Sequence, residues 1–289
     1  MTDKHKKEID PLSGAETTGH NWDGIKELNL PAPRWWLIVF LLCCIWAVGY
    51  WIVYPAWPTI AGHTRGLNSW TSHKKLALDQ EEITARHAQF IESIKNKTLT
   101  EIQNDPQLYA FAVAGGKTMF KENCSACHGT GAEGRKGFPN LNDDDWLWGG
   151  KLDDIYTTLK YGIRSTHEHT RTSQMPAFGK DGILKPAQIA LVADYVLSLS
   201  GGQQASEDGQ AIFKENCASC HNDDGKGKRE FGAPNLADSL WLYGDDKQSI
   251  IQQISNPRSG VMPTWEARLP DTTIKQLTIY VHSLGGGEK

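Results

Sequence analysis

The sequence predicts an all-α protein with one N-terminal transmembrane helix followed by two tandem copies of a small helical domain. Three observations lead to this prediction. Residues 35–54 contain no charged side chain, several motifs beyond residue 110 occur twice in the same order, and no run in either copy alternates apolar and polar residues for long enough to make a sheet.

The composition is that of a slightly acidic protein large enough for two domains. The chain has 289 residues, 39% of them hydrophobic, and its 30 Lys and Arg against 34 Asp and Glu leave a formal charge of −4. A protein that binds nucleic acid needs an excess of basic residues, so we expect no nucleic-acid partner. A single apolar span excludes a polytopic membrane protein, and six cysteines are too few for a disulfide scaffold.

The first 34 residues are polar, end in Pro-Ala-Pro, and predict an extended tail. As a helix, the uncharged run from Trp35 to Tyr54 would span roughly 30 Å, the thickness of the hydrocarbon core of a bilayer. A cleaved signal peptide is the alternative, but the run is too long and begins too far along the chain. We therefore expect an uncleaved single-pass anchor. Lys26 and Arg34 before it, against Arg65 after it, weakly favour a cytoplasmic N-terminus.

Residues 55–110 predict a spacer that is largely helical. Apolar residues from Leu78 to Lys97 recur at helical spacing, and Asp105-Pro106 predicts a break. The spacer lifts the following domains off the membrane; the alternative is a packing surface for another subunit.

Beyond residue 110 the chain repeats itself, which predicts domains at residues 111–201 and 206–286, joined by a polar linker from Gly201 to Asp208. The repeated motifs are Phe120 to Cys124 with Phe213 to Cys217, Pro139 to Leu141 with Pro234 to Leu236, Trp146 to Gly149 with Trp241 to Gly244, and Met175-Pro176 with Met262-Pro263. Each copy predicts a helix before its cysteines, one starting near Asp153 or Gln248, and a terminal one at about Pro186–Leu199 or Thr272–Leu284.

Each copy contains Cys-x-x-Cys-His, the motif of covalent haem c attachment. The residues are Cys124, Cys127 and His128 in the first copy and Cys217, Cys220 and His221 in the second. Two thiols on one turn can add to the haem vinyl groups, and the histidine then ligates the iron. A thioredoxin-like pair would follow a strand, and a zinc site would leave both histidines unexplained. We therefore expect two covalently attached haems c. Cys43 and Cys44, in the predicted span, are interpreted as small apolar residues.

Met175 and Met262 are the predicted second axial ligands. Of the four methionines, Met1 begins the chain and Met119 lies on the helix before Cys124, so these two remain. A thioether opposite imidazole raises the potential and leaves no open position, which suits electron transfer. His167 and His169 are rival ligands in the first copy.

The surroundings of the haems can also be predicted. A backbone carbonyl at Pro139 or Pro234 could accept a hydrogen bond from the axial imidazole. Six aromatic side chains are expected to wall the haems or to lock the first helix against the last: Trp146, Trp241, Phe120, Phe213, Tyr195 and Tyr280. Because covalent haem is attached outside the bacterial inner membrane, we expect the haem domains in the periplasm.

The chain resembles the membrane-anchored di-haem subunit, subunit III, of cbb3-type cytochrome c oxidases. The resemblance rests on GHNWDGIKELNLPAPRWW (Gly19 to Trp36), both haem motifs, FPNL (Phe138 to Leu141) and YGIRS…MPAFG (Tyr161 to Gly179). Leu30 stands where the family often has Asn, and the additional N-terminal membrane helix of some members is not found in this sequence.

The resemblance implies two class I cytochrome c domains and a place in a respiratory chain. Electrons would pass from a soluble periplasmic cytochrome c to a mono-haem partner subunit and then to the haem–copper catalytic subunit. It also implies that the two methionines serve either their own repeat or, exchanged, the other one. A stand-alone membrane-tethered di-haem carrier and a di-haem peroxidase are the alternatives, and the methionine in each copy argues against the peroxidase.

Overall fold

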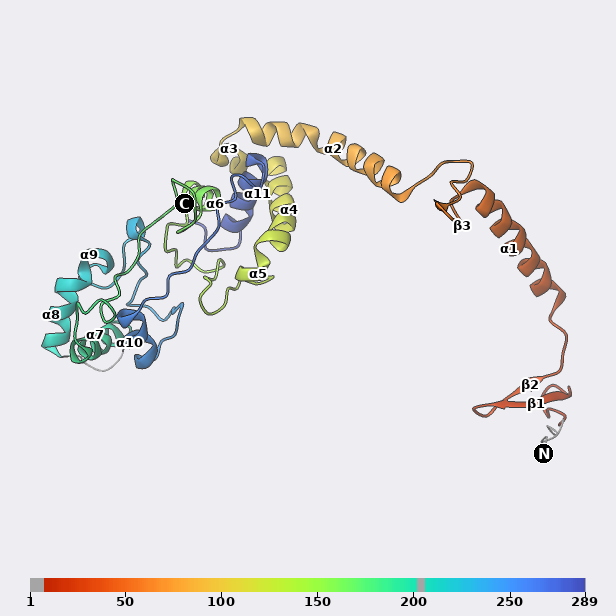
Figure 1. Ribbon diagram of the computed structural model, residues 1–289, viewed down its shortest axis with the longest axis horizontal. Coiled ribbons are helices and arrows are strands. Elements are labelled where there is room, and N and C mark those ends of the chain that lie inside the picture. Colours follow the sequence, from red (N-terminus) through yellow and green to blue (C-terminus); the bar gives the residue numbers. More distant parts are fainter. Residues whose placement is uncertain (1–7, 202–205, 289) are drawn as a thin grey trace. The chain divides into compact units, whose positions relative to one another are not determined.

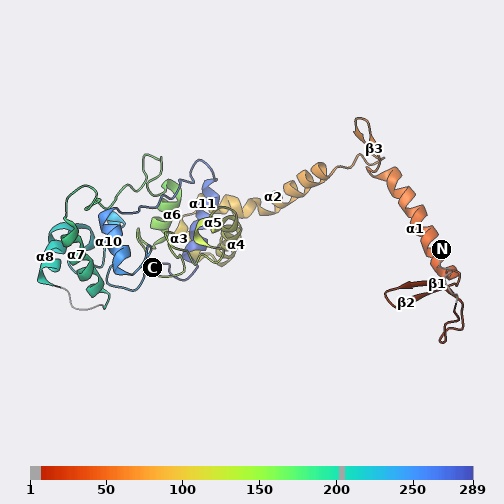
Figure 2. The ribbon, with the colours of Figure 1, turned by 60° about the horizontal axis from the view of Figure 1, so that its bottom comes forward.

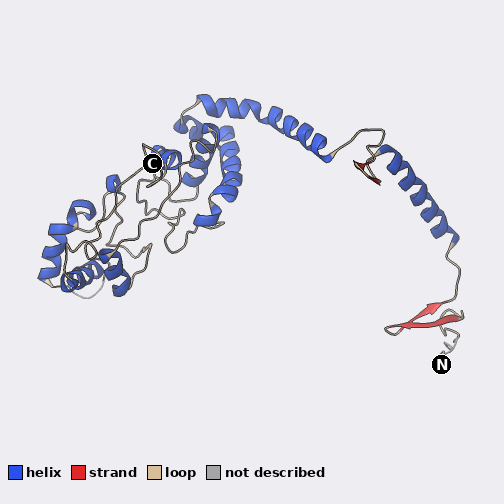
Figure 3. Ribbon diagram, in the orientation of Figure 1, coloured by secondary structure: helices blue, strands red, loops and turns tan. Residues whose placement is uncertain are grey.

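The computed structural model describes residues 8–201 and 206–288, and its contacts divide the chain into two units, Met1–Arg86 and His87–Lys289. Helices dominate both units (Figures 1 and 3). Among the described residues, the two small sheets are two-stranded hairpins in the first unit. The predicted helical fold with one apolar N-terminal helix is confirmed, and the hairpins are additional to it.

The described part of the first unit contains a hairpin where the sequence predicted an extended tail. β1 (Thr17–Trp22) and β2 (Ile25–Leu28) pair antiparallel around Asp23 and Gly24, which both have positive φ angles of 49° and 93°. Asp-Gly is a preferred pair for a two-residue turn of this kind. The signal was therefore present in the sequence, but the polar composition concealed it.

The predicted membrane span forms α1 (Arg34–Val53), one residue earlier than expected. It is long and apolar enough to cross a membrane, and none of its residues is buried in the protein. Cys43 and Cys44 are exposed on it as free thiols. A short hairpin follows, whose strands β3 (Pro58–Thr59) and β4 (Gly62–His63) have two residues each.

The remaining elements are helices. They are α2 (Ser72–Asn96), α3 (Leu99–Asn104), α4 (Pro106–Asn123), α5 (Ser125–His128), α6 (Leu152–Tyr161), α7 (Pro186–Leu199), α8 (Glu207–Asn216), α9 (Ala218–His221), the 3-10 helix η1 (Arg229–Phe231), α10 (Lys247–Ser255) and α11 (Asp271–His282). The expected helix before each cysteine motif is present, and both terminal helices are confirmed to within two residues. Within the predicted linker, residues 202–205 lie outside the described residues. The linker was expected to end at Asp208, but α8 already begins at Glu207.

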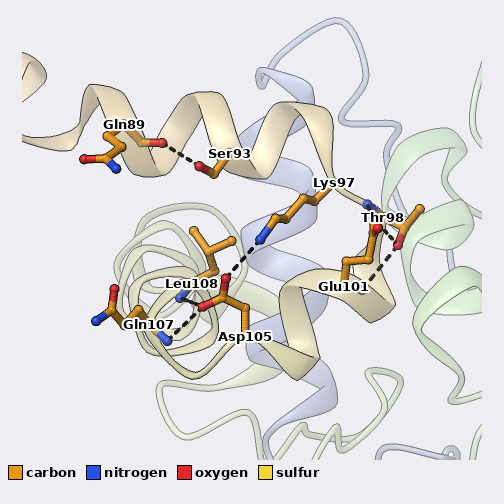
Figure 4. Close-up of polar contacts among 8 residues, drawn as sticks. All are labelled: Gln89, Ser93, Lys97, Thr98, Glu101, Asp105, Gln107 and Leu108. Carbon is orange, nitrogen blue, oxygen red and sulfur yellow. Dashed lines mark hydrogen bonds and ion pairs between the residues drawn. The ribbon is translucent and has the colours of Figure 1, made fainter.

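Side-chain caps fix the turns from α2 to α4 (Figure 4). The Thr98 hydroxyl accepts a hydrogen bond from the Glu101 N–H at 3.2 Å, and the Glu101 carboxylate accepts one from the Thr98 N–H at 2.7 Å. Asp105 caps α4 and lies 2.9 Å from the Lys97 ammonium. Pro at the first position of α4 has no N–H to donate, so the expected break falls between α3 and α4.

The last helix of each repeat packs on the other repeat. α11 lies against α4 and α6, whereas α7 lies against α8 and α10 (Figures 1 and 2). The first core contains Phe120, Cys124, Ile155, Leu159, Trp265, Ile274, Leu277, Tyr280 and Val281. The second core contains Phe178, Leu184, Ile189, Val192, Ala193, Tyr195, Val196, Phe213, Cys217, Ile250 and Ile254. The boundaries at 111–201 and 206–286 describe the repeats in the sequence and stay a prediction as domain boundaries. Each packed core contains helices from both repeats.

A glycine and a phenylalanine one helical turn apart allow α4 to cross closely against α11, and α8 against α7. A Cβ on Gly116 would lie 2.2 Å from the Gln276 carbonyl oxygen of α11, and a Cβ on Gly209 would lie 2.5 Å from the Leu191 oxygen of α7. Phe120 and Tyr280 have ring centroids 5.4 Å apart. The matching pair, Phe213 with Tyr195, is at 5.1 Å. The predicted role of these four aromatic residues in locking helices together is confirmed, with the partners exchanged.

Candidate haem c sites

Each cysteine motif forms a single turn directly after a helix. The Cys124 N–H donates to the Phe120 carbonyl at 2.8 Å, which continues α4, and the Cys124 carbonyl accepts from the His128 N–H at 3.0 Å. In the second motif the His221 N–H donates to the Cys217 carbonyl at 2.9 Å. Both thiols and the imidazole of a motif therefore lie on one turn, as attachment to a single haem requires.

Both histidines are oriented by a proline carbonyl, as the sequence predicted. The Nδ1 atom of His128 lies 3.1 Å from the Pro139 oxygen, and that of His221 lies 3.1 Å from the Pro234 oxygen. A carbonyl only accepts, so Nδ1 carries the proton and Nε2 keeps its lone pair. Burial lowers the pKa of both histidines, although the proline carbonyls act in the opposite direction. Neutral imidazoles are suited to bind iron.

Two glycines allow the proline loops to approach the histidines. The Gly134 N–H donates to the His128 carbonyl at 2.7 Å, and the Gly227 N–H donates to the His221 carbonyl at 2.9 Å. Both glycines have positive φ, and a Cβ on either would lie within 2.6 Å of backbone atoms of the proline loop. Any larger residue would push Pro139 or Pro234 away from its histidine.

The thiols fit covalent attachment better than redox exchange. Burial, and next the neighbouring Cys127 or Cys220, raises the pKa of Cys124 and of Cys217 to about 11. Exchange-active pairs instead hold a thiolate with a lowered pKa. Among the described residues all six cysteines are free, and no cluster of His, Cys, Asp and Glu suits a metal ion.

The second motif opens on a cavity of about 490 Å³ that is also lined by Met175. This volume is in the range of sites for organic cofactors. Its apolar lining includes Phe178, Val192, Val196, Phe213, Leu236, Trp241, Ile250 and Ile254. Cys217, Cys220 and His221 line the same cavity, so a thiol pair, an imidazole and a thioether meet in one apolar space. This donor set fits a haem c.

The other predicted methionine ligand, Met262, lies beside the first motif. Met262, Leu141 and Trp146 pack against the first core, which contains Cys124. Two backbone hydrogen bonds of 3.0 Å join Met262 to Ile163, and so fix its position beside the first repeat. Each methionine therefore lies with the cysteines of the other repeat. The sequence had left this pairing open.

Family models match three parts of the chain. They are the N-terminal domain of cytochrome oxidase-cbb3, FixP, over residues 14–61, cytochrome c over 113–200, and cytochrome C oxidase, cbb3-type, subunit III over 204–281. A cbb3-type cytochrome c oxidase subunit FixP from Bradyrhizobium sp. (strain ORS 278) is 56% identical, over 97% of this chain and 98% of its own. A subunit CcoP from Azospirillum brasilense is 47% identical, over 98% and 99%. The chain belongs to the FixP/CcoP family.

The rival histidines of this family member have other partners. The Nε2 atom of His167 lies 2.8 Å from a Glu266 oxygen, and its Nδ1 accepts from the His169 N–H at 3.0 Å. Both ring nitrogens of His167 are thus hydrogen-bonded within the protein. The His169 side chain is 64% exposed. This arrangement favours the interpretation of both as loop histidines.

Arg164, beside them, joins the two methionine segments. Its Nε donates to the Gly260 carbonyl at 2.7 Å, and its Nη1 donates to the Ser173 carbonyl at 2.9 Å. These carbonyls lie two residues before Met262 and Met175. Arg164 also lines the cavity of the second motif. No local signal in the sequence reveals this role, because the acceptors are backbone atoms of distant residues.

Three acidic residues of the first repeat, Glu133, Asp143 and Asp145, line the cavity of the second motif. Burial raises the pKa of Asp145 to about 6, with smaller contributions from Asp238, Asp143 and Asp144, against which Arg229 acts. The sequence did not identify these residues as neighbours of the second motif, because they belong to the first repeat, which has a haem motif of its own.

Proposed function

We propose that the chain is the electron-transfer subunit of a cbb3-type cytochrome c oxidase and carries two covalently attached haems c. The first would be held by Cys124, Cys127, His128 and Met262, and the second by Cys217, Cys220, His221 and Met175. The observation that carries this proposal is the shared cavity of His221, Met175 and a cysteine pair, together with its matching motif in the first repeat.

The haem iron supplies one-electron redox chemistry when bound. The protein supplies orientation, because the proline carbonyls hold each imidazole with Nε2 free to bind. Met262 and Met175 would each supply a second ligand to the iron, and the apolar side chains of the second motif's cavity would limit the access of water. Such sites suit electron transfer, and we infer no bond-making chemistry in this subunit.

The family and the apolar helix α1 support a proposal about partners and orientation. We infer that electrons from a soluble periplasmic cytochrome c reach the mono-haem and haem–copper subunits by way of this subunit. The haem domains would lie in the periplasm of a bacterial cell, and α1 would cross the inner membrane lipid with the N-terminal residues in the cytoplasm.

A pyridine haemochrome spectrum with a haem count tests the cofactors. We expect two haems c per polypeptide that resist extraction by acid acetone, and one in Cys217→Ser/Cys220→Ser. Extraction of all haem from the unchanged protein would contradict covalent attachment.

Mild detergent extraction followed by size measurement tests the oxidase assignment. We expect copurification with a larger haem–copper assembly, whereas a lone species would support a stand-alone carrier. Peroxide turnover by the isolated subunit, or carbon monoxide binding to its reduced form, would support the peroxidase instead.

A further inference from the structure

The segment that follows α1 folds back onto the C-terminal end of that helix. The Leu67 N–H donates to the Ile52 carbonyl at 3.1 Å, and the Asn68 N–H donates to the Val53 carbonyl at 3.2 Å. Gly66 has φ +66°, and a Cβ there would lie 2.4 Å from the Val53 oxygen. These contacts satisfy carbonyls that a helix end otherwise leaves free, so the segment is tied to the level at which α1 ends.

Hydrogen bonds also stiffen this segment. The Thr64 hydroxyl accepts from the Ala56 and Trp57 N–H groups at 3.3 and 3.1 Å, and the Thr64 N–H donates to the Trp57 carbonyl at 2.9 Å. Together with the β3–β4 hairpin, they make residues 54–70 a compact loop.

The loop exposes large apolar side chains next to the aromatic end of α1. Ile60, at the hairpin tip, is fully exposed, and Trp57, Leu67 and Trp70 are 54%, 77% and 42% exposed. The Trp57 ring lies 4.8 Å from the ring of Trp51 on α1. Exposed apolar side chains grouped in this way mark an interaction surface, and tryptophans beside a membrane span are typical of the lipid–water boundary.

The charge of this region suits phospholipid. The sequence contains no Asp or Glu from Leu28 to Leu78, whereas Arg65, Lys74 and Lys75 follow α1, the last of them paired with Asp79. Headgroup phosphates therefore meet no carboxylate on the loop.

We propose that residues 54–70 form a collar that lies in the headgroup–acyl boundary of the bilayer, with Ile60 and Trp57 in the lipid. The collar fixes the depth of the end of α1 and hence the level at which the spacer leaves the membrane. The partner is lipid, because the hydrogen bonds to Ile52 and Val53 hold the collar where the span ends. The proposal rests on α1 crossing the membrane and is independent of the haem ligands.

Lipid-borne quenchers test the collar. Ile60→Cys, in full-length protein with Cys43→Ser and Cys44→Ser, carries an NBD fluorophore in nanodiscs with or without lipids that bear a shallow doxyl group. We expect the doxyl lipids to quench this label at least twofold more than the same label at the exposed Glu92→Cys, both in the subunit and in the intact oxidase. Equal quenching at the two positions would overturn the proposal. So would a label at position 60 that, in the oxidase, is shielded from both doxyl lipid and aqueous iodide, because a protein neighbour would then cover the loop.

Gly66→Ala provides a second test. The added methyl group collides with the Val53 carbonyl, so we expect the extra quenching at position 60 to fall by half or more. An unchanged haem count and redox titration would show that the haem domains are intact. Undiminished quenching in this variant would contradict the role of the helix-end contacts.

Discussion

The two haem sites share one local geometry but have different surroundings. In both, an imidazole Nδ1 lies 3.1 Å from a proline carbonyl oxygen. The first site follows an 18-residue helix, α4, against which α3 and the end of α2 pack through Ile94, Leu99, Ile102 and Leu108. The second follows the 10-residue α8 and has no such cover among the described residues.

The cysteine motif therefore controls little beyond its own turn and loop. The methionine and the closing helix come from the other repeat at both sites. Cys124 and Cys217 lie in the cores that these helices close, and the two motif turns have the same hydrogen bonds. The two sites can be perturbed separately at the methionines, together at Arg164, which joins the methionine segments, or at Asp145 in the cavity of the second motif.

Replacing the methionines should have the largest effect. In a Cys217→Ser/Cys220→Ser background, which leaves the first haem attached, we expect Met262→His to lower the midpoint potential by on the order of 100 mV, because axial ligand identity sets haem potentials. Met175→His should leave that potential unchanged. Spectroelectrochemical titration measures both. The reverse pattern would show that each methionine serves its own repeat.

Arg164→Gln should perturb both sites, to a smaller extent. Its guanidinium holds the segments before Met175 and Met262, so we expect a weaker iron–sulfur charge-transfer band and a potential lower by on the order of tens of mV at each haem. Arg171→Gln is the matched control, because it removes the same charge from the same loop but leaves both carbonyls bound. Equal effects of the two variants would assign the result to charge alone.

The pH dependence of the second haem should be the smallest effect. Because burial raises the pKa of Asp145 to about 6, its carboxyl is neutral below that pH and ionised above it. A negative charge stabilises oxidised iron, so the potential of the second haem should fall by on the order of tens of mV between pH 5 and pH 8. Asp145→Asn should remove this pH-dependent fall in potential. Asp144→Asn, at the exposed neighbouring position, should retain it. The first haem, titrated in parallel, should lack the step, and an equal step there would contradict the assignment to Asp145.

Residue type and spacing predicted the parts of the molecule that depend on neighbouring residues. The uncharged run of α1, the Cys-x-x-Cys-His turns and the break before Pro106 are local, and their chemistry follows from residue type and spacing. The carbonyls of Pro139 and Pro234 were also predictable, because each lies on a short loop that begins at its own histidine. The Asp23-Gly24 turn was equally local, but the polar tail around it concealed the signal.

Tertiary packing determines which distant segments meet. Both repeats carry the same glycine, phenylalanine and tyrosine, so either pairing of first and last helices satisfies the sequence pattern equally well. The exchange of α7 and α11 thus depends on contacts across the whole haem-binding unit, and it determines which methionine lies with which cysteines. The bonds of Arg164 and the burial of Asp145 follow from the same packing, because burial and backbone hydrogen bonds between distant residues leave no mark on local sequence.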